Sequence, residues 1–461
     1  MDGNDALVLM MFISFIGLLM AGFPVAYCLW GSAILFVGIG YIADVFFHTS
    51  TGMGYTFVGM TIRRIYGTMS NWILVSIPMF IYMGLMLEHS GAADRLLQSS
   101  QELFGRVRGG LAVTTILIGV LLAASTGIVG ASVVLLGMLS MSTMLNQGYS
   151  HELTTGTIIA SGTLGILIPP SIMLVFMADL TAQSAGDLFL GALFPGLLLG
   201  TLYILFVLIY AYFRPNSAPL PISQNRISAA TVLRVLRDTL PTTFLILAVL
   251  GSIFAGIATV TEASGVGAMA ATLLAILNRK LTISVIKGVF IGTFRTVAYI
   301  MSILVGATCF ALVLRGLGGD RVIENVLTSL PVGPTGIVVC IMLAVFLLGF
   351  FLDWMEITFI VMPLVVPVVS KLDLRIDGYG VIENAVLVWF TVMVAVNLQT
   401  SFLTPPVGPS IFYLQGLCPK EVKLEHLYRG VIPFILIQVF VLFLVFFWPG
   451  LVTWLPSIAY R

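Results

Sequence analysis

The sequence predicts an all-α polytopic membrane protein that consists of two inverted repeats. The composition is the first reason, because 59% of the residues are hydrophobic and only 9% are charged, whereas a soluble chain carries about 25% charged residues. Many apolar runs also approach or exceed the about 20 residues that cross a bilayer. Motifs in the first half return in the second half. No basic surface interleaved with aromatic residues occurs, so we expect a lipid bilayer and no nucleic acid as partner.

The first half predicts three spans, a surface arm, a re-entrant hairpin and a broken helix. Apolar segments at residues 110–124 and 128–145 follow each other without a polar loop, which predicts a hairpin with its tip at Ser125-Thr126-Gly127. Residues 153–180 then cross the membrane with a break at 165–170. The other elements are, in order, spans 6–21, 25–42 and 72–87, an interfacial stretch with Arg63 and Arg64, the amphipathic arm 89–109 and the returning span 188–213.

The second half repeats this order after one long hydrophilic connector, residues 214–238. A second hairpin is expected around Leu352-Asp353-Trp354, between apolar segments 335–351 and 355–369, and a second broken helix at 384–415. The other elements are, in order, spans 240–257, 263–277 and 289–314, a second arm near Gly318, and a last span 424–447 that ends in interfacial tryptophans.

Both broken helices contain adjacent prolines inside an apolar run. Pro169-Pro170 and Pro405-Pro406 lack backbone N–H groups and disfavour helical geometry in the preceding residues, so nearby carbonyl groups lose their partners. In hydrocarbon, such groups are tolerated only where protein, water or an ion satisfies them. Broken helices in corresponding positions of two halves are the best sequence indication of a transporter's binding site.

The spacing of the motifs indicates an internal repeat. The arm residues Asp94 and Asp320 are 226 residues apart, as are the two hairpin tips, and the two Pro-Pro pairs are 236 apart. With the N-terminus outside, the cytoplasmic loops carry 13 Lys and Arg residues and the outer segments carry 7, which agrees with the positive-inside rule. The first hairpin then enters from the cytoplasm and the second from outside, so the repeats are inverted.

The family resemblance given below implies that these elements form a scaffold and an elevator-type transport domain. The parts are scaffold helices of the first repeat (1–88), an amphipathic arm (89–109), the first hairpin and broken helix of the transport domain (110–187), a connecting span and cytoplasmic linker (188–239), scaffold helices of the second repeat (240–315), a second arm (316–333), the second hairpin and broken helix of the transport domain (334–418), and a final span (419–461).

The two tips and the two breaks should meet near the middle of the membrane. Helix N-termini there suit a carboxylate, and broken turns offer carbonyl oxygens to a small cation. A carboxylate in an apolar tip, such as Asp353, must find a cation, a proton or strong donors. A structural salt bridge is the alternative for Asp353, and Glu356 is either a neighbour in the site or a packing partner. The hydroxyls available as neutral ligands are those of Ser125, Thr126, Thr163, Thr400, Ser401 and Thr404.

Four motifs together resemble a known family. They are Ala124-Ser125-Thr126-Gly127-Ile128-Val129-Gly130-Ala131, Ala160-Ser161-Gly162-Thr163-Leu164-Gly165 through Pro169-Pro170-Ser171, Gly349-Phe350-Phe351-Leu352-Asp353, and Asn397-Leu398-Gln399-Thr400-Ser401-Phe402-Leu403-Thr404-Pro405-Pro406. Over nearly the whole chain they resemble the large membrane subunit, the DctM-like permease, of TRAP (tripartite ATP-independent periplasmic) transporters. The resemblance implies Na⁺-driven import of an organic anion, a carboxylate, across a bacterial inner membrane by an elevator motion. It also implies two partners, a small four-span membrane subunit and a periplasmic substrate-binding protein.

The resemblance further implies the site residues. One Na⁺ would lie where the first tip meets the first break, and another where the second tip meets the second break. The implied Na⁺ ligands are Ser125, Gly127, Gly162, Gly165 and Pro169 for the first ion, and Asp353, Thr400, Ser401, Thr404 and Pro405 for the second. The substrate would lie against Ser125, Thr126, Gly127, Thr163, Thr400 and Thr404.

Other functions account for less of this pattern. A stand-alone Na⁺/carboxylate symporter of the divalent-anion-symporter type would share the inverted repeats and need no binding protein. A channel is the next alternative, although inverted broken helices favour alternating access. An enzyme is not expected, because no HExxH, GxSxG or histidine cluster occurs. Arg295 and Asp179 fall near expected span ends, where solvation or pairing between helices is the simpler explanation.

Overall fold

The structure is a computed structural model of the chain. It describes residues 3–47, 51–92, 95–96, 99, 104, 107–126, 129–220 and 229–459. Every regular element in these ranges is a helix, which confirms the all-α prediction. The tip residue Gly127, the arm residue Asp94 and residues 221–228 of the linker lie outside the described ranges.

The helices follow the expected order in both halves. The first half contains α1 (Gly3–Met20), α2 (Val25–Phe47), α3 (Tyr55–Met69), η1 (Trp72–Val75), α4 (Ser76–His89), α6 (Gly110–Thr126), α7 (Val129–Asn146), α8 (His151–Thr163), η2 (Leu164–Ile166), α9 (Ile172–Thr181), α10 (Ala185–Phe213) and η3 (Pro215–Ser217). The second half contains α11 (Ala229–Phe254), α12 (Val260–Leu277), α13 (Ile283–Gly316), α14 (Gly319–Thr328), α15 (Pro334–Leu348), α16 (Trp354–Ile360), α17 (Met362–Val369), α18 (Ala385–Leu403), α19 (Pro409–Gln415), α20 (Leu424–Phe447) and α21 (Gly450–Ala459).

Length and composition identify the membrane-crossing helices. Within the described residues, eight are long and apolar enough to cross a bilayer: α2, η1 with α4, α7, α10, α12, α13, α18 and α20. The first arms of the two hairpins, α6 and α15, are among the shorter apolar helices, as expected of re-entrant segments. In the best window of α18, 94% of the residues are buried, so this broken helix is surrounded by protein and not by lipid.

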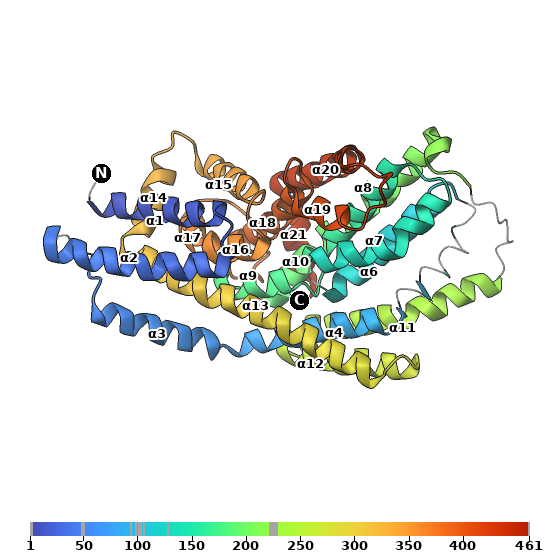
Figure 1. The fold of residues 1–461 in the computed structure, drawn as a ribbon, viewed down its shortest axis with the longest axis horizontal. Coiled ribbons are helices and arrows are strands. Elements are labelled where there is room, and N and C mark those ends of the chain that lie inside the picture. Colours follow the sequence, from blue (N-terminus) through green and yellow to red (C-terminus); the bar gives the residue numbers. More distant parts are fainter. Residues whose placement is uncertain are drawn as a thin grey trace.

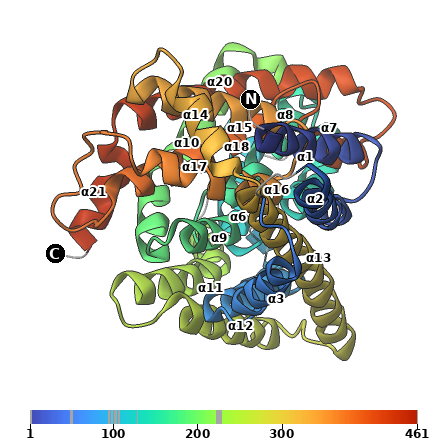
Figure 2. The ribbon, with the colours of Figure 1, turned by 90° about the vertical axis from the view of Figure 1, so that its left-hand side faces the viewer.

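The helices form two packed groups. The scaffold body consists of α1–α4 and α11–α14, and the hairpin body consists of α6–α10 and α15–α21. Figure 1 shows α3, α4, α12 and α13 along the lower side and α8, α18, α19 and α20 above them, and Figure 2 shows α3 and α12 below α8, α18 and α20 from the end. The two groups meet where α4 contacts α6 and where α13 contacts α16.

Contacts between helices follow an approximate two-fold symmetry. In the scaffold body α2 packs on α13 and α4 packs on α12, and in the hairpin body α8 packs on α20 and α18 packs on α10. The amide of Gln399 donates a hydrogen bond of 3.4 Å to Thr163 Oγ1, and these residues are separated by 236 positions, as are the two Pro-Pro pairs. Equivalent residues that touch each other lie on the symmetry axis, so the two breaks meet at this axis. Both Pro-Pro bonds are cis.

Glycines allow the close contact between α8 and α20. A Cβ atom on Gly156 would overlap the carbonyl oxygen of Gly430, and one on Gly430 would overlap the carbonyl oxygen of Glu152. In lipid, packing and not the hydrophobic effect holds helices together, and small residues let their backbones approach. Gly251 in α11 is a contrast, because a Cβ there would have no atom within 4 Å.

Two of the helix boundaries that differ from the sequence-based expectation have a clear cause in the sequence. α11 begins at Ala229, inside the expected linker, because Leu233, Leu236 and Leu240 recur at helical spacing and give an amphipathic start to the span. These three leucines are 55% to 68% exposed, so they form an outward apolar stripe. The second arm of the second hairpin is divided into α16 and α17, because Pro363 in the first turn of α17 has no N–H to continue the preceding helix.

Replacing Gly430 with alanine should destabilise the protein by about 1–3 kcal/mol, the usual cost of forcing an extra group into a packed contact. Gly251→Ala is the matched control and should be neutral or stabilising by up to about 1 kcal/mol. Thermal unfolding of both variants in the same detergent measures the difference. Equal melting temperatures for Gly430→Ala, Gly251→Ala and wild type would contradict the close α8–α20 contact.

Candidate functional site

The first hairpin packs directly on the first broken helix. Gly119 of α6 lies against Ser161 of α8, since an added Cβ would come within 2.6 Å of the serine Cβ. Gly162 lies against the backbone of Val133 in α7, with the Val133 nitrogen 2.9 Å from an added Cβ. Both arms of the hairpin therefore touch consecutive residues of α8, just before its break.

The second hairpin packs in the same way on the second broken helix. Gly349, directly after α15, contacts the Ser401 hydroxyl so closely that an added Cβ would overlap it. Asn397 Nδ2 donates a hydrogen bond of 2.7 Å to the Met342 carbonyl in α15. Each hairpin thus packs on the helix that leads into the break of its own repeat.

The hydroxyl groups at the two breaks direct their hydrogens into their own helices. The bonds are Thr163 Oγ1 to Ala160 O at 2.9 Å, Thr400 Oγ1 to Val396 O at 2.9 Å, Ser401 Oγ to Leu398 O at 2.8 Å, and Thr404 Oγ1 to Thr400 O at 2.7 Å. Such bonds are common in helices. Each hydroxyl group donates its only hydrogen to a carbonyl group of its own helix. Its oxygen can therefore act only as an acceptor, and its lone pairs remain available to a cation or to a hydrogen-bond donor.

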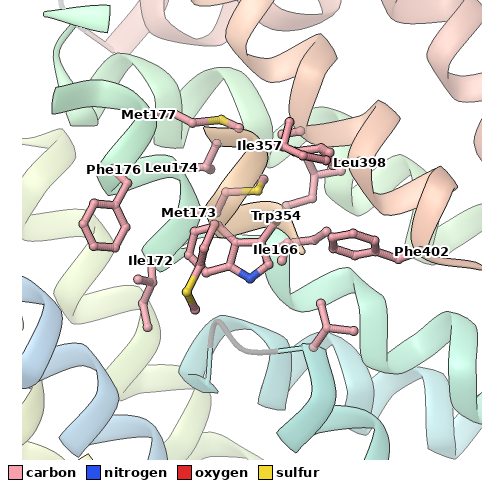
Figure 3. Packing of buried hydrophobic residues seen from close by; sticks show 14 of the residues in the cluster. Ile166, Ile172, Met173, Leu174, Phe176, Met177, Trp354, Ile357, Leu398 and Phe402 are labelled. Atoms are coloured by element: carbon pink, nitrogen blue, oxygen red, sulfur yellow. The ribbon is translucent and has the colours of Figure 1, made fainter. Parts of the chain in front are cut away.

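The second tip is anchored between the two breaks. Asp353 caps α16, and its Oδ1 accepts a hydrogen bond of 2.8 Å from the Trp354 N–H. The indole of Trp354 is 1% exposed and lies among Ile166 of the first break and Leu398 and Phe402 of the second (Figure 3). This packing fixes the position of the first residue of α16 and therefore of its N-cap, Asp353.

A second carboxylate lies one turn further along α16. Glu356 is only 2% exposed, and no hydrogen-bond partner of its Oε2 occurs in the described part of the chain. The phenol groups of Tyr299 in α13 and Tyr413 in α19 lie within electrostatic reach of both Asp353 and Glu356. The second tip therefore carries two acids, and a phenol group from each body lies near them.

The second tip and the start of α7, which follows the first tip in the chain, line one cavity, which we call the tip cavity. It has a volume of about 540 Å³ and lies between the scaffold body and the hairpin body. The hairpin side is formed by Val129-Gly130-Ala131, directly after the first tip, by Asp353-Trp354-Met355 of the second tip, and by Tyr413. The scaffold side is formed by Ile81, Leu85 and Glu88 of α4 and by Arg295, Thr296 and Tyr299 of α13.

Three charged residues line the tip cavity: Glu88, Arg295 and Asp353. Among the described residues, the ion pairs join Arg315 to Asp320, Lys371 to Glu324 and Arg429 to Glu425, so none of them neutralises a charge of the cavity. Arg295 was expected near a span end, but it lies twelve residues inside α13. Its side chain is exposed, and the residue lines the tip cavity.

Polar contacts join the two bodies toward the side that the Lys and Arg distribution assigns to the outside. Asn71 Nδ2 donates a hydrogen bond of 2.6 Å to Asp179 of α9. Arg315 donates one of 3.0 Å to the carbonyl of Pro363, and Lys371 forms an ion pair of 2.6 Å with Glu324. The tip cavity, in contrast, includes Glu88, near the cytoplasmic end of α4. In this structure, polar contacts therefore join the two bodies at their outer ends, and the cavity lies toward the cytoplasmic end of α4.

The residues named from the sequence fall into separate places. Asp353 lines the tip cavity. Thr163, Gly162, Gly165 and Pro169 are buried at the first break, Thr400 and Ser401 are buried at the second, and Thr404 and Pro405 are half-buried there. The side chains of Ser125 and Thr126, at the end of α6, and the whole of Gly127 lie outside the described part.

Sequence reasoning did not identify the scaffold side of the cavity. Glu88, Tyr299 and Tyr413 carry no motif, and they meet only through the packing of α4, α13 and α19. One signal was available, because Arg295 is the single basic residue inside a long apolar run. An ionisable residue within a membrane span is by default a candidate functional residue.

The inverted repeats, the paired hairpins and the cavity between two bodies define a membrane transport protein. The family described as "Tripartite ATP-independent periplasmic transporter, DctM component" matches residues 12–451. The chain therefore belongs to this family and is a large membrane subunit of a TRAP transporter, which confirms the resemblance.

Relatives match over most of the chain. The C4-dicarboxylate TRAP transporter large permease protein DctM of Pseudomonas aeruginosa is 29% identical and covers 86% of this chain and 88% of its own. The sialic acid TRAP transporter large permease protein SiaM of Vibrio cholerae is 25% identical, covering 96% and 97%. The isethionate TRAP transporter permease protein DctMQ of Oleidesulfovibrio alaskensis is 26% identical, covering 82% of this chain and 57% of its own. The crystal structure of the Alcanivorax borkumensis YdaH transporter shares the fold, with a TM-score of 0.58 at 14% identity over 84% of this chain and 89% of that one.

Thr163→Val should destabilise the protein by about 1–3 kcal/mol, because it removes the hydroxyl that Gln399 reaches across the symmetry axis and leaves a buried amide unpaired. Gln399 is 0% exposed, and its Oε1 has no partner among the described residues. Thr391→Val on α18 is the matched control, because the Thr391 hydroxyl is also buried and has no partner there. Thermal unfolding compares the two. Equal stability of the variants would show that the axis contact contributes nothing.

Proposed function

We propose that this chain imports an organic anion, a carboxylate, together with Na⁺, as the permease subunit of a secondary transporter. The observation that carries this proposal is the tip cavity, in which residues next to both inverted hairpin tips meet between two bodies. Asp353 supplies the cavity with a carboxylate from the second tip. The names of the C4-dicarboxylate and sialic acid permeases support a carboxylate substrate.

The donor groups at the tips and breaks suit Na⁺. One carboxylate, from Asp353, and several neutral oxygens match a hard monovalent cation better than a soft metal. We propose that Asp353 with Thr400, Ser401, Thr404 and the backbone around Pro405 holds one Na⁺. The first break, from Gly162 through Gly165 to Pro169, would hold the other, with Ser125 and Gly127 of the first tip. The hydroxyl lone pairs left free at the breaks support this assignment.

The charges of the tip cavity explain how cation and anion binding would be coupled. Without a cation, two carboxylates, Asp353 and Glu88, face one guanidinium, Arg295, so the lining has one net negative charge. A substrate carboxylate at roughly 5 Å from Asp353 would be repelled by about 3 kcal/mol at an effective dielectric constant of 20. Na⁺ bound at Asp353 removes this repulsion, which raises the affinity for the anion by about a hundredfold.

The two bodies support an elevator motion. The scaffold body and the hairpin body each have their own close contacts, and they meet along α4–α6 and α13–α16. We propose that the hairpin body carries cation and anion past the scaffold body. The polar contacts at the outer ends, such as Asn71 with Asp179, would hold the arrangement described here, in which the outer ends are joined, and would break when the hairpin body moves outward.

We further propose that the permease works with two partners in a bacterial inner membrane. The family description as tripartite and periplasmic supports a small four-span membrane subunit and a soluble periplasmic substrate-binding protein. The isethionate relative named DctMQ supports a second membrane component, because this chain covers 57% of it.

Uptake by proteoliposomes tests the proposal. The permease is reconstituted with its small subunit and its binding protein, and radiolabelled C4-dicarboxylate and sialic acid serve as probes. We expect uptake only with an inward Na⁺ gradient and all three components. Full uptake in Na⁺-free buffer without a pH gradient would overturn the proposal. Uptake by the permease alone would instead support a stand-alone symporter.

Asp353→Asn should remove the part of the Na⁺ stabilisation of the purified protein that comes from the ion proposed at the second tip. A cation at 100 times its dissociation constant stabilises a protein by about 2.7 kcal/mol through mass action, and the neutral amide lacks the charge that holds it. Asp320→Asn is the control, because Asp320 lies in an ion pair with Arg315 away from the cavity. Melting curves in Na⁺ and in choline measure the effect. An unchanged Na⁺ response of Asp353→Asn would exclude Asp353 as a ligand.

The double variant Asn71→Cys/Asp179→Cys should stop uptake when it is cross-linked and regain uptake on reduction. The two side chains are in direct contact across the bodies, so a short link would fix the present arrangement. The variant is made after removal of the four free cysteines, Cys28, Cys309, Cys340 and Cys418.

The control for this cross-link is Ser90→Cys/Asn278→Cys. Asn278 donates a hydrogen bond to the Ser90 carbonyl within the scaffold body, so its cross-link should leave uptake intact. Unimpaired uptake by the cross-linked Asn71/Asp179 pair would contradict movement of the two bodies.

A further inference from the structure

We propose that Arg295 of the scaffold body binds the acid group of the substrate in the present arrangement of the two bodies. This inference rests on the proposed import of a carboxylate, and it assigns the group that the sequence motifs leave out. The hairpin body supplies the tips and Asp353, whereas Arg295 is the only basic residue among the described residues that line the tip cavity.

The position of Arg295 requires an explanation. It lies twelve residues after Ile283, about 18 Å along the helix at 1.5 Å per residue, inside a span that crosses the membrane. An arginine there is costly unless it faces water, a partner or a ligand. Its side chain is exposed, it lines the tip cavity, and none of the ion pairs of the described residues includes it.

The neighbouring groups complete a site for an acid. Tyr299 lies one turn after Arg295 on the same face of α13, as expected of residues four apart, and it also lines the cavity. Tyr413 faces it from α19 of the hairpin body. A guanidinium offers a planar pair of donors that matches a carboxylate or a sulfonate, and the two phenols offer further O–H donors.

Glu88 of α4 carries the opposite charge to Arg295 on the scaffold side of the cavity. Its carboxylate lines the same cavity and lowers the local positive potential, so Glu88 weakens anion binding while Arg295 strengthens it. The two residues therefore predict effects of opposite sign on one measurement, which a merely structural role of either residue would not give.

The location of Arg295 on the scaffold body has a consequence for transport. Asp353 moves with the hairpin body, whereas Arg295 stays with the scaffold body. Arg295 therefore adds to anion affinity only while the outer ends of the bodies are joined, as they are here through Asn71 and Asp179. Arg295 is therefore a specificity-determining residue that favours anions only while the cavity opens to this side of the membrane.

Chemical modification of the wild-type permease tests the proposal without a transport assay. Phenylglyoxal reacts with accessible guanidinium groups, and mass spectrometry reports the rate at each arginine. We expect succinate to slow the reaction of Arg295 by about tenfold in Na⁺ buffer, as for loss of access to a charge-assisted contact of ordinary strength, and much less in choline buffer. Arg279 is the control, because it is exposed at the end of α12 and should react equally with and without succinate.

Variants give the second arm of the test. Glu88→Gln should lower the succinate concentration that protects Arg295. In succinate-binding measurements on the purified permease, Arg295→Gln should weaken binding about tenfold and Arg295→Lys should restore part of it. Equal reaction rates of Arg295 with and without succinate in Na⁺ buffer, or equal protection of Arg279, would overturn the proposal.

The outcomes separate this inference from the proposed function. Na⁺-dependent uptake without protection of Arg295 would end the inference alone. Protection of Arg295 together with uptake that needs no Na⁺ would end the proposed coupling and leave the Arg295 site in place.

Discussion

Backbone groups that lose their helical partners inside a membrane must be satisfied by the protein, and this constraint shapes the structure. The two Pro-Pro pairs interrupt α8–α9 and α18–α19 at equivalent positions. The hairpin of each repeat packs on the helix just before its interruption, through Gly162 on Val133 and through Gly349 on Ser401. The breaks also meet each other, through Thr163 and Gln399. A buried polar centre therefore results from the need to keep broken helices out of lipid.

The same arrangement separates two kinds of chemistry. The hairpin body holds the free hydroxyl lone pairs, the interrupted backbone and the acids Asp353 and Glu356, which are groups that suit a cation. The scaffold body contributes Arg295 and Tyr299 to the opposite side of the tip cavity, which are groups that suit an anion. In the proposed function, an ion and an acid at this boundary would contact both bodies, and movement of one body past the other would change which groups they contact.

The sequence predicted the fold well because membrane helices have a simple signal. Apolar runs, the Pro-Pro breaks and the repeat offset gave the order of spans, hairpins and broken helices. The offset of 236 even relates Thr163 to Gln399, which the structure brings together. The scaffold side of the cavity could not be predicted, because Glu88, Tyr299 and Tyr413 belong to ordinary apolar helices and meet only in three dimensions. The early start of α11 was missed because a short amphipathic segment before a span has the composition of a linker.

In the proposed mechanism, two rigid bodies share one cavity and move relative to each other. Double electron–electron resonance between two spin labels measures this movement. One label is attached at position 279 of the scaffold body, in place of Arg279, and one at position 423 of the hairpin body, in place of Lys423. The distance is measured in the reconstituted transporter with and without Na⁺ and substrate. A label pair at Gln147 and Lys423, both on the hairpin body, is the reference. If the bodies move, the distance between positions 279 and 423 has two populations whose ratio depends on Na⁺ and substrate. The reference distance between positions 147 and 423 stays constant. A single, invariant distance between Arg279 and Lys423 under all conditions would contradict it.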